Sequence, residues 1–133
     1  MRVALGLGCE RGASLATVEA AIAEALARAD MGRSAVCRLA TIDRKRDEAA
    51  ILALAARYGW PLHLFSAAEL SAVPVRSPSE TVRRRMGTPA VAEAAALLAA
   101  ETDLRGLVLE KHKHKGRDGK NATVAIASLG LGG

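Results

Sequence analysis

The sequence predicts an α/β domain whose sheet is mixed but mostly parallel and has about five strands. Short apolar runs alternate with stretches of helical periodicity in the first half of the chain, as in parallel sheets with crossover helices. The last two apolar runs, 106–109 and 123–127, are separated by a basic loop, which favours a hairpin and hence a mixed sheet. The whole chain, 1–133, has the length of one domain.

Five strands are expected at the apolar runs 2–8, 35–42, 62–65, 106–109 and 123–127. The first run is apolar through its middle and ends at glycine. A helix follows it, because Ser14 can cap a stretch in which apolar residues recur at three- and four-residue spacing from Leu15 to Ala29. The stretch DRKRDE after the second strand leads into another helix, which Gly59 and Pro61 end.

Signals for helix starts recur in the second half of the chain. Ser66 and Glu69 have the spacing of a capping box before a short helical turn, and Ser77 and Glu80 repeat that spacing. Residues 88–89, Thr-Pro, open a further helix through AVAEAAALLAA. The alanines of this helix predict close packing against the sheet.

Composition narrows the functional classes. Lysine and arginine outnumber the acidic residues by 19 to 14, and the late stretch EKHKHKGRDGK is the most basic, which indicates an anionic partner. Only Tyr58, Trp60 and Phe65 are aromatic. Because few aromatic side chains are present to stack on bases, no nucleic acid is expected as a partner. No apolar stretch approaches the ~20 residues of a membrane span, and a signal-peptide pattern is missing. We therefore expect a cytoplasmic protein that binds no membrane.

The loop GLGCERGAS, 6–14, is rich in glycine but does not fit a dinucleotide site. The Rossmann fingerprint needs G-x-G-x-x-G, and Arg11 occupies the position of the third glycine, with Gly12 one residue late. We therefore expect no nucleotide cofactor. The amides of 12–14, near a helix N-terminus, could bind a carboxylate or phosphate, reinforced by Arg11. The alternative is a tight turn that needs glycine only to bend.

Three loops fall at the predicted carboxyl edge of the sheet, namely 9–14, 43–48 and 111–121. Ligands of open α/β sheets bind at this edge. We expect Arg11, Lys45 and Lys111 to meet there in one positively charged hollow. Such a hollow suits a small ligand with several carboxylates better than it suits a nucleic acid.

Acidic side chains near strand ends are candidates for chemistry. Asp43, Lys45 and Glu48 follow the second strand, where neighbouring charges can shift one another's proton affinity and serve in acid–base steps. Alternatively, Asp43 is a helix cap and Glu48 a solvated acid of the first helical turn. Glu93 stands among apolar residues, so it either faces solvent, the more common case, or is held by a partner.

Histidine and cysteine give no clear site. His112 and His114 would lie on one side of an extended segment, but the flanking lysines repel a divalent cation, so no protein-held metal is expected. His63 lies in an apolar strand and is predicted to be structural. Cys9 has no base near it in sequence, which favours a packed or surface thiol over a nucleophile. Cys9 and Cys37 are expected to be reduced.

The loops as a set resemble a known family. The CobE family, itself similar to the C-terminal domain of CbiG, has blocks that match GLGCERGAS, LATIDRKRDEAAI, LHLFSAAEL, GTPAVAEAAALLAA, LVLEKHKHK and NATVAIA in this order. Both take part in cobalamin biosynthesis. The resemblance spans 3–127 and implies a single three-layer α/β/α domain. It also implies a precorrin or corrinoid ligand, a tetrapyrrole-derived ring that carries acetate and propionate carboxylates.

Site residues can be carried over by motif. The resemblance implies ligand binding by Gly8, Cys9, Arg11, Gly12, Lys45, Thr88 and Lys111. Glu48 and Glu93 match the family's blocks as well. The stretch HKHKGRDGK departs from the family's pattern because it is longer and more basic.

Two functions follow from the resemblance. The first is a carrier or accessory protein, without a cofactor of its own, that binds a precorrin or corrinoid intermediate of the aerobic pathway. The second is an enzyme acting on a precorrin, such as a lactone-opening hydrolase resembling cobalt-precorrin-5A hydrolase, with Asp43, Lys45, Glu48 and Glu93 as its working residues. CbiG enzymes carry an additional N-terminal domain that this sequence is not expected to contain. Other corrin-pathway enzymes, or a second copy of the chain in a homodimer, stay open as partners.

Overall fold

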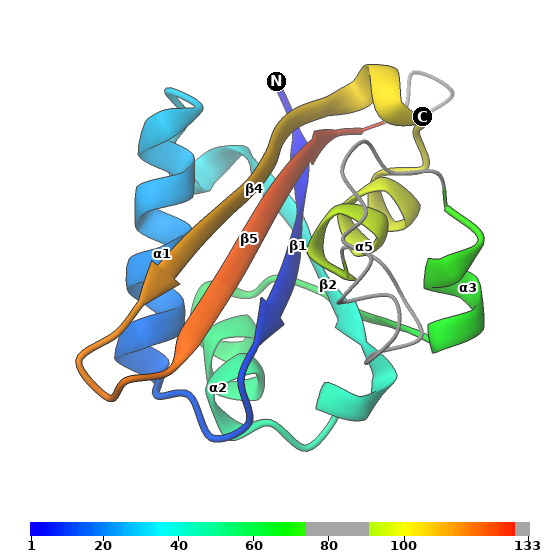
Figure 1. Ribbon diagram of the computed structural model, residues 1–133. Helices are drawn as coiled ribbons and strands as arrows, with labels where there is room; N and C mark the ends of the chain where they lie inside the picture. The colour runs from blue at the N-terminus through cyan, green and yellow to red at the C-terminus, as the bar shows by residue number, and fades with distance from the viewer. Residues whose placement is uncertain (74–90, 130–133) are drawn as a thin grey trace.

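The computed structural model describes residues 1–73 and 91–129 and contains a five-stranded sheet in the order β3-β2-β1-β5-β4 (Figure 1). The strands are β1 (Val3–Cys9), β2 (Val36–Ile42), β3 (Leu62–Phe65), β4 (Leu107–Lys115) and β5 (Asn121–Ser128). The helices are α1 (Leu15–Arg28), α2 (Ala49–Tyr58), α3 (Ala67–Ser71) and α5 (Val91–Ala100). The predicted α/β class is confirmed.

The sheet is mixed, as predicted. β1 pairs with β2, and β2 with β3, in parallel, whereas β5 is antiparallel to both β1 and β4. β4 consequently runs in the same direction as β1. The carboxyl ends of β1, β2, β3 and β4 therefore lie at the same edge of the sheet, where ligands of open α/β sheets bind.

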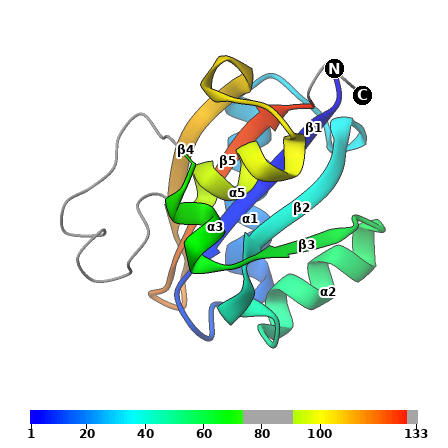
Figure 2. The same cartoon turned by 90° about the vertical axis from the view of Figure 1, so that its right-hand side faces the viewer.

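Helices cover both faces of the sheet and give three layers (Figures 1 and 2). Leu5 and Leu7 of β1 belong to the core under α1 and α2, whereas Ala4 belongs to the core under α3 and α5. This division follows from the alternation of side chains along a strand. The longest described helix, α1, has 14 residues, and none of those described has the length and hydropathy to cross a bilayer.

Small residues let α5 lie close to the sheet, as its alanines predicted. A Cβ atom at Gly6 would lie 1.8 Å from the carbonyl oxygen of Ala92, so the helix backbone rests directly on β1. Ala40 and Ala125 are buried in the same core. Because α5 packs so tightly, its first residues are held at a fixed place beside the carboxyl end of β1.

Three local signals for helix ends are confirmed, whereas the alternative that Asp43 caps a helix is wrong, because Glu48 is the N-cap of α2. The Ser14 side chain accepts a hydrogen bond from the Thr17 amide, and Ser66 and Glu69 form a reciprocal capping box. Gly59 ends α2 in the left-handed region at φ 68°. The predicted helix starts at Ser77, Glu80 and 88–89 lie outside the described residues.

One boundary differs from the prediction. β4 was expected to end at Leu109, with a loop from Lys111 to Asn121, but the strand continues through Lys115. Alternating lysine and histidine suits an edge strand with two different faces, and β5 supplies partners as far as Asn121. The basic stretch is therefore mostly rigid strand, and the turn of the hairpin is short.

Candidate functional site

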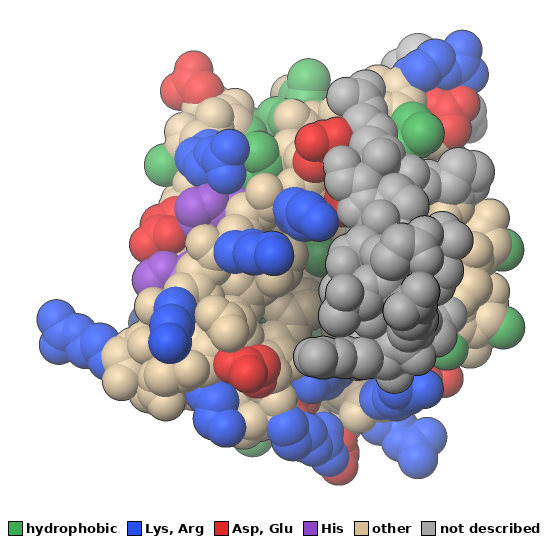
Figure 3. Space-filling view, in the orientation of Figure 1, with side chains coloured by type: hydrophobic (Ala, Val, Ile, Leu, Met, Phe, Trp, Pro, Cys, Tyr) green, Lys and Arg blue, Asp and Glu red, His purple; other side chains and the backbone are tan. Residues whose placement is uncertain are grey.

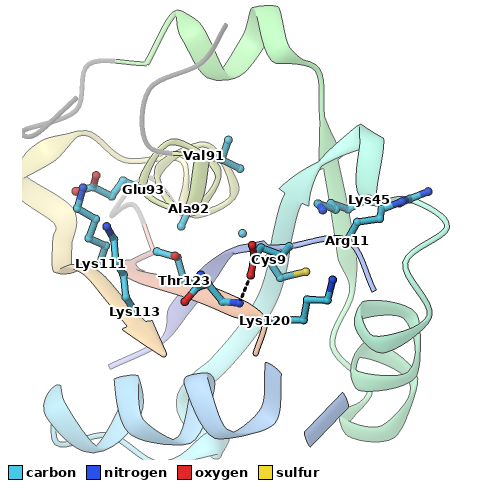
Figure 4. A pocket seen from close by; sticks show the side chains of 13 residues that line it. Cys9, Arg11, Lys45, Val91, Ala92, Glu93, Lys111, Lys113, Lys120 and Thr123 are labelled. Carbon is cyan, nitrogen blue, oxygen red and sulfur yellow. Dashed lines mark hydrogen bonds between the residues drawn. The ribbon is translucent and has the colours of Figure 1, made fainter. Parts of the chain in front are cut away.

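A cavity of about 740 Å³ opens at the carboxyl edge of the sheet, between the start of α5 and the ends of β1 and β4 (Figure 4). Its floor includes Gly8, Cys9 and Thr123, and Val91 and Ala92 of α5 form one wall. Its cations are Arg11, Lys45, Lys111, Lys113 and Lys120. Arg11, Lys45 and Lys111 thus share one hollow, as the sequence analysis expected. Figure 3 shows lysine and arginine side chains gathered on this face of the molecule.

Among the residues that the structure describes, no acidic side chain pairs with the four lysines of the cavity. Within 1–73 and 91–129, the side chains of Lys45, Lys111, Lys113 and Lys120 form no ion pair or hydrogen bond. Their positive charge is therefore available to an anionic ligand. Lys45 lies on one side of the cavity and Lys111 and Lys113 on the other (Figure 4).

The alternation of β4 directs its two residue types to opposite faces. Lys111 and Lys113 line the cavity. His112 and His114 meet α1 instead, where His112 Nε2 lies 2.6 Å and His114 Nδ1 3.0 Å from the Glu24 carboxylate. The prediction that the two histidines share one side is confirmed, and their contact with Glu24 fixes the lysine-bearing strand to α1.

Arg11 lines the cavity, but its guanidinium is already paired. It forms a bidentate contact with Asp47, 2.9 Å at each nitrogen, and lies 3.2 Å from Glu48 Oε2. Its hydrogen bond to Asp47 raises the pKa of Arg11 above its usual value and lowers that of Asp47. A ligand at Arg11 would have to share the guanidinium with these two acids.

The amides of 12–14 do not form an open anion site, so that hypothesis is wrong. The Gly12 amide donates to Glu48 Oε1 at 2.6 Å, and the Ser14 amide donates to Asp118 Oδ2 at 2.9 Å. Ala13 donates to the Glu10 carbonyl. The chemistry was predicted correctly, since carboxylates do bind here, but they belong to the chain itself.

The candidate catalytic residues do not converge as a set. Lys45 and Glu93 line the cavity. Glu48 is buried against the 9–14 loop, which contradicts its interpretation as a solvated acid, and Asp43 is exposed in the turn Asp43–Lys45. Glu93 is fully buried in the first turn of α5, so the expectation that it faces solvent is wrong. Only two of the four candidates could therefore touch one ligand.

Cys9 also lines the cavity and is partly buried. Burial raises the pKa of its thiol above the usual value, and the positive charge of Lys45 only partly opposes this effect. A raised pKa favours the protonated thiol over a nucleophilic thiolate, in agreement with the preferred prediction. Thr88, the remaining residue carried over by motif, lies outside the described residues.

A family model described as "Cobalamin synthesis G C-terminus" matches residues 3–127. The chain belongs to this family. Cobalt-precorrin-5A hydrolase of Priestia megaterium is 35% identical over 127 residues, which are 96% of this chain and 32% of that protein. Protein CobE of Sinorhizobium sp is 40% identical over 98 residues, 72% of this chain and 64% of that protein. The chain thus spans about a third of the hydrolase and under two-thirds of that CobE.

A solved structure agrees with family membership. The crystal structure of CobE, a protein from the cobalamin (vitamin B12) biosynthetic pathway, is similar to this chain with a TM-score of 0.79 and 33% identity, covering 96% of this chain and 90% of that one. The resemblance stated from the loop sequences is therefore confirmed, and the chain is a member of a cobalamin biosynthesis family.

The residues that were not assigned from the sequence include two lysines of the cavity and Asp118, which lies outside its lining. Lys113 and Lys120 line the cavity beside Lys111, and strand alternation applied to KHKHK would have indicated Lys113. Asp118 joins the hairpin turn to α1 through the Ser14 amide and the Thr17 hydroxyl, at 2.9 and 3.0 Å. These bonds, with one from the Lys120 amide, lower the pKa of Asp118 to about 2. Its position before Gly119 marked only a turn.

Proposed function

We propose that this chain binds a precorrin or corrinoid intermediate in the cavity, as a carrier or accessory factor of cobalamin biosynthesis. The observation that carries the proposal is the set of four lysines, without acidic partners in the described chain, around a floor of small residues. Acetate and propionate groups at the edge of a macrocycle are the anions that such an arrangement recognises.

The size of the cavity supports a ligand that inserts only in part. Cavities that hold small molecules measure roughly 300–1,000 Å³, and this one, at about 740 Å³, is left partly open by the described residues. A corrinoid ring could lie with one face toward the floor of the cavity and leave part of its periphery in solvent. This partial enclosure suits a protein that passes its ligand on.

The strength of binding depends on several weak contacts at once. An ammonium–carboxylate contact at a solvent-open site contributes about 0.2–1 kcal/mol. Removal of one lysine should therefore weaken binding by up to about fivefold, and removal of two by up to about thirtyfold.

The alternative function is hydrolysis of a precorrin, which the name of the Priestia megaterium relative supports. Two observations favour binding without chemistry. Asp43 and Glu48 do not line the cavity, and the Cys9 thiol has a raised pKa.

The test is a titration of hydrogenobyrinic acid followed by its visible spectrum, with mass analysis of a lactone-bearing precorrin recovered after incubation with the protein. We expect saturable binding and an unchanged mass. Lys113→Ala should weaken binding, whereas Lys115→Ala, with the same loss of charge on the same strand but outside the cavity, should not. Equal affinities of the two variants would contradict the proposed site, and a changed mass would favour the hydrolase.

A further inference from the structure

Among residues 1–73 and 91–129, no contact explains why residue 8 is glycine. A Cβ atom at this position would meet no heavy atom within 4 Å, and Gly8 is not among the glycines with positive φ. Glycine in a strand costs roughly 0.5–1 kcal/mol of stability relative to alanine. Its presence therefore points to a molecule outside the chain that comes close to this backbone.

Gly6, the other glycine of β1, differs from Gly8 because a neighbouring helix requires it. Gly6 lies on the same face of β1, two residues earlier, and a Cβ atom there would collide with the Ala92 carbonyl at 1.8 Å. Gly6 is thus explained by α5. α5 begins at Val91 and does not reach over Gly8, so no described residue covers the strand backbone at this point of the cavity.

The surroundings of Gly8 form a flat floor with charge at its sides. Thr123 is its partner in register on β5 and lines the same cavity. Cys9 and Thr123 lie between Lys45 on one side and Lys111 on the other (Figure 4). A broad ring can rest on such a floor while its peripheral carboxylates reach lysines at opposite sides.

We propose that Gly8 determines specificity for a macrocycle, because the missing side chain lets the face of the ring lie against the backbone of β1. The inference rests on the proposed function and deepens it. The lysines recognise carboxylates on any scaffold, whereas the bare strand at Gly8 admits a broad, flat ring. The ligand class is therefore a ring-shaped polycarboxylate rather than a small open-chain acid.

The test compares Gly8→Val and Gly8→Ala with the wild-type protein in titrations of hydrogenobyrinic acid. Valine suits a strand and meets open space, so the thermal midpoint should be unchanged or higher. The affinity should fall at least tenfold for Gly8→Val and less for Gly8→Ala. Lys115→Ala, on β4 but outside the cavity, should bind within threefold of wild type.

The outcomes separate this inference from the proposed function. A folded Gly8→Val protein with wild-type affinity, together with weakened binding by Lys113→Ala, would overturn the role of Gly8 and leave the proposed function standing. Failure of the wild-type protein to bind hydrogenobyrinic acid would overturn both. If the Gly8→Val protein does not fold, the Gly8→Ala protein tests the role of Gly8 instead. A Gly8→Ala affinity equal to that of wild type would then overturn the inference.

Discussion

Replacement of Gly6 by alanine should destabilise the fold strongly, because α5 rests on the β1 backbone at this residue. The new Cβ atom would lie 1.8 Å from the Ala92 carbonyl oxygen and 2.6 Å from the Ala96 amide nitrogen. The helix would have to move by about 1.6 Å to restore an ordinary contact of 3.4 Å. Overpacking of a core costs typically 1–3 kcal/mol, and a clash between two backbones belongs at the upper end, about 3 kcal/mol.

Thermal denaturation followed by circular dichroism measures this loss. For a domain of this size, about 3 kcal/mol corresponds to a fall of roughly 10 °C in the midpoint. Gly8→Ala is the matched control, since it adds the same methyl group to the same strand without a contact. A Gly6→Ala midpoint within about 2 °C of wild type would refute the reasoning that α5 is seated on bare backbone.

Three further predictions concern the loop, the hairpin and the ligand. Asp118→Asn should lower the thermal midpoint at neutral pH. The difference from wild type should shrink as pH falls from about 4 to 2, because the pKa of Asp118 is about 2 in the fold against an ordinary 3.8. A difference that does not change with pH would contradict this prediction. Glu48→Gln should cost about 2 kcal/mol in urea denaturation, since it removes charged acceptors for the Gly12 amide and Arg11, and an unchanged midpoint would count against that role. Binding of hydrogenobyrinic acid should weaken between low and high salt, as titrations at two ionic strengths would measure. The Lys111→Ala, Lys113→Ala double variant should show a smaller salt dependence. An equal salt dependence would contradict the role of these two lysines in binding.

The elements that depend on neighbouring residues could be predicted from the sequence. The cap at Ser14, the capping box at Ser66 and the left-handed Gly59 need only residues within one or two turns, and all three are confirmed. The end of β4 could not be predicted in the same way. Lysine and histidine resemble loop residues in composition, and only pairing with β5 and contact with Glu24 make the segment a strand.

The candidate site was predictable in its location but not in its partners. Arg11, Lys45 and Lys111 meet because parallel strands bring their carboxyl ends to one edge. The amide of Ser14, in contrast, is bound by Asp118, 104 residues away, and local sequence contains no sign of that contact. The burial of Glu93 could not be predicted, because spacing within one helix does not reveal what covers it.

The most direct measurement of the central claim is a crystal structure of the protein with hydrogenobyrinic acid. The account predicts the ring in the cavity at the carboxyl edge, its face over Gly8 and its carboxylates within hydrogen-bond distance of Lys45 on one side and Lys111 or Lys113 on the other. A ring bound elsewhere, such as in the second cavity of about 500 Å³ between α3 and Leu104, would contradict it.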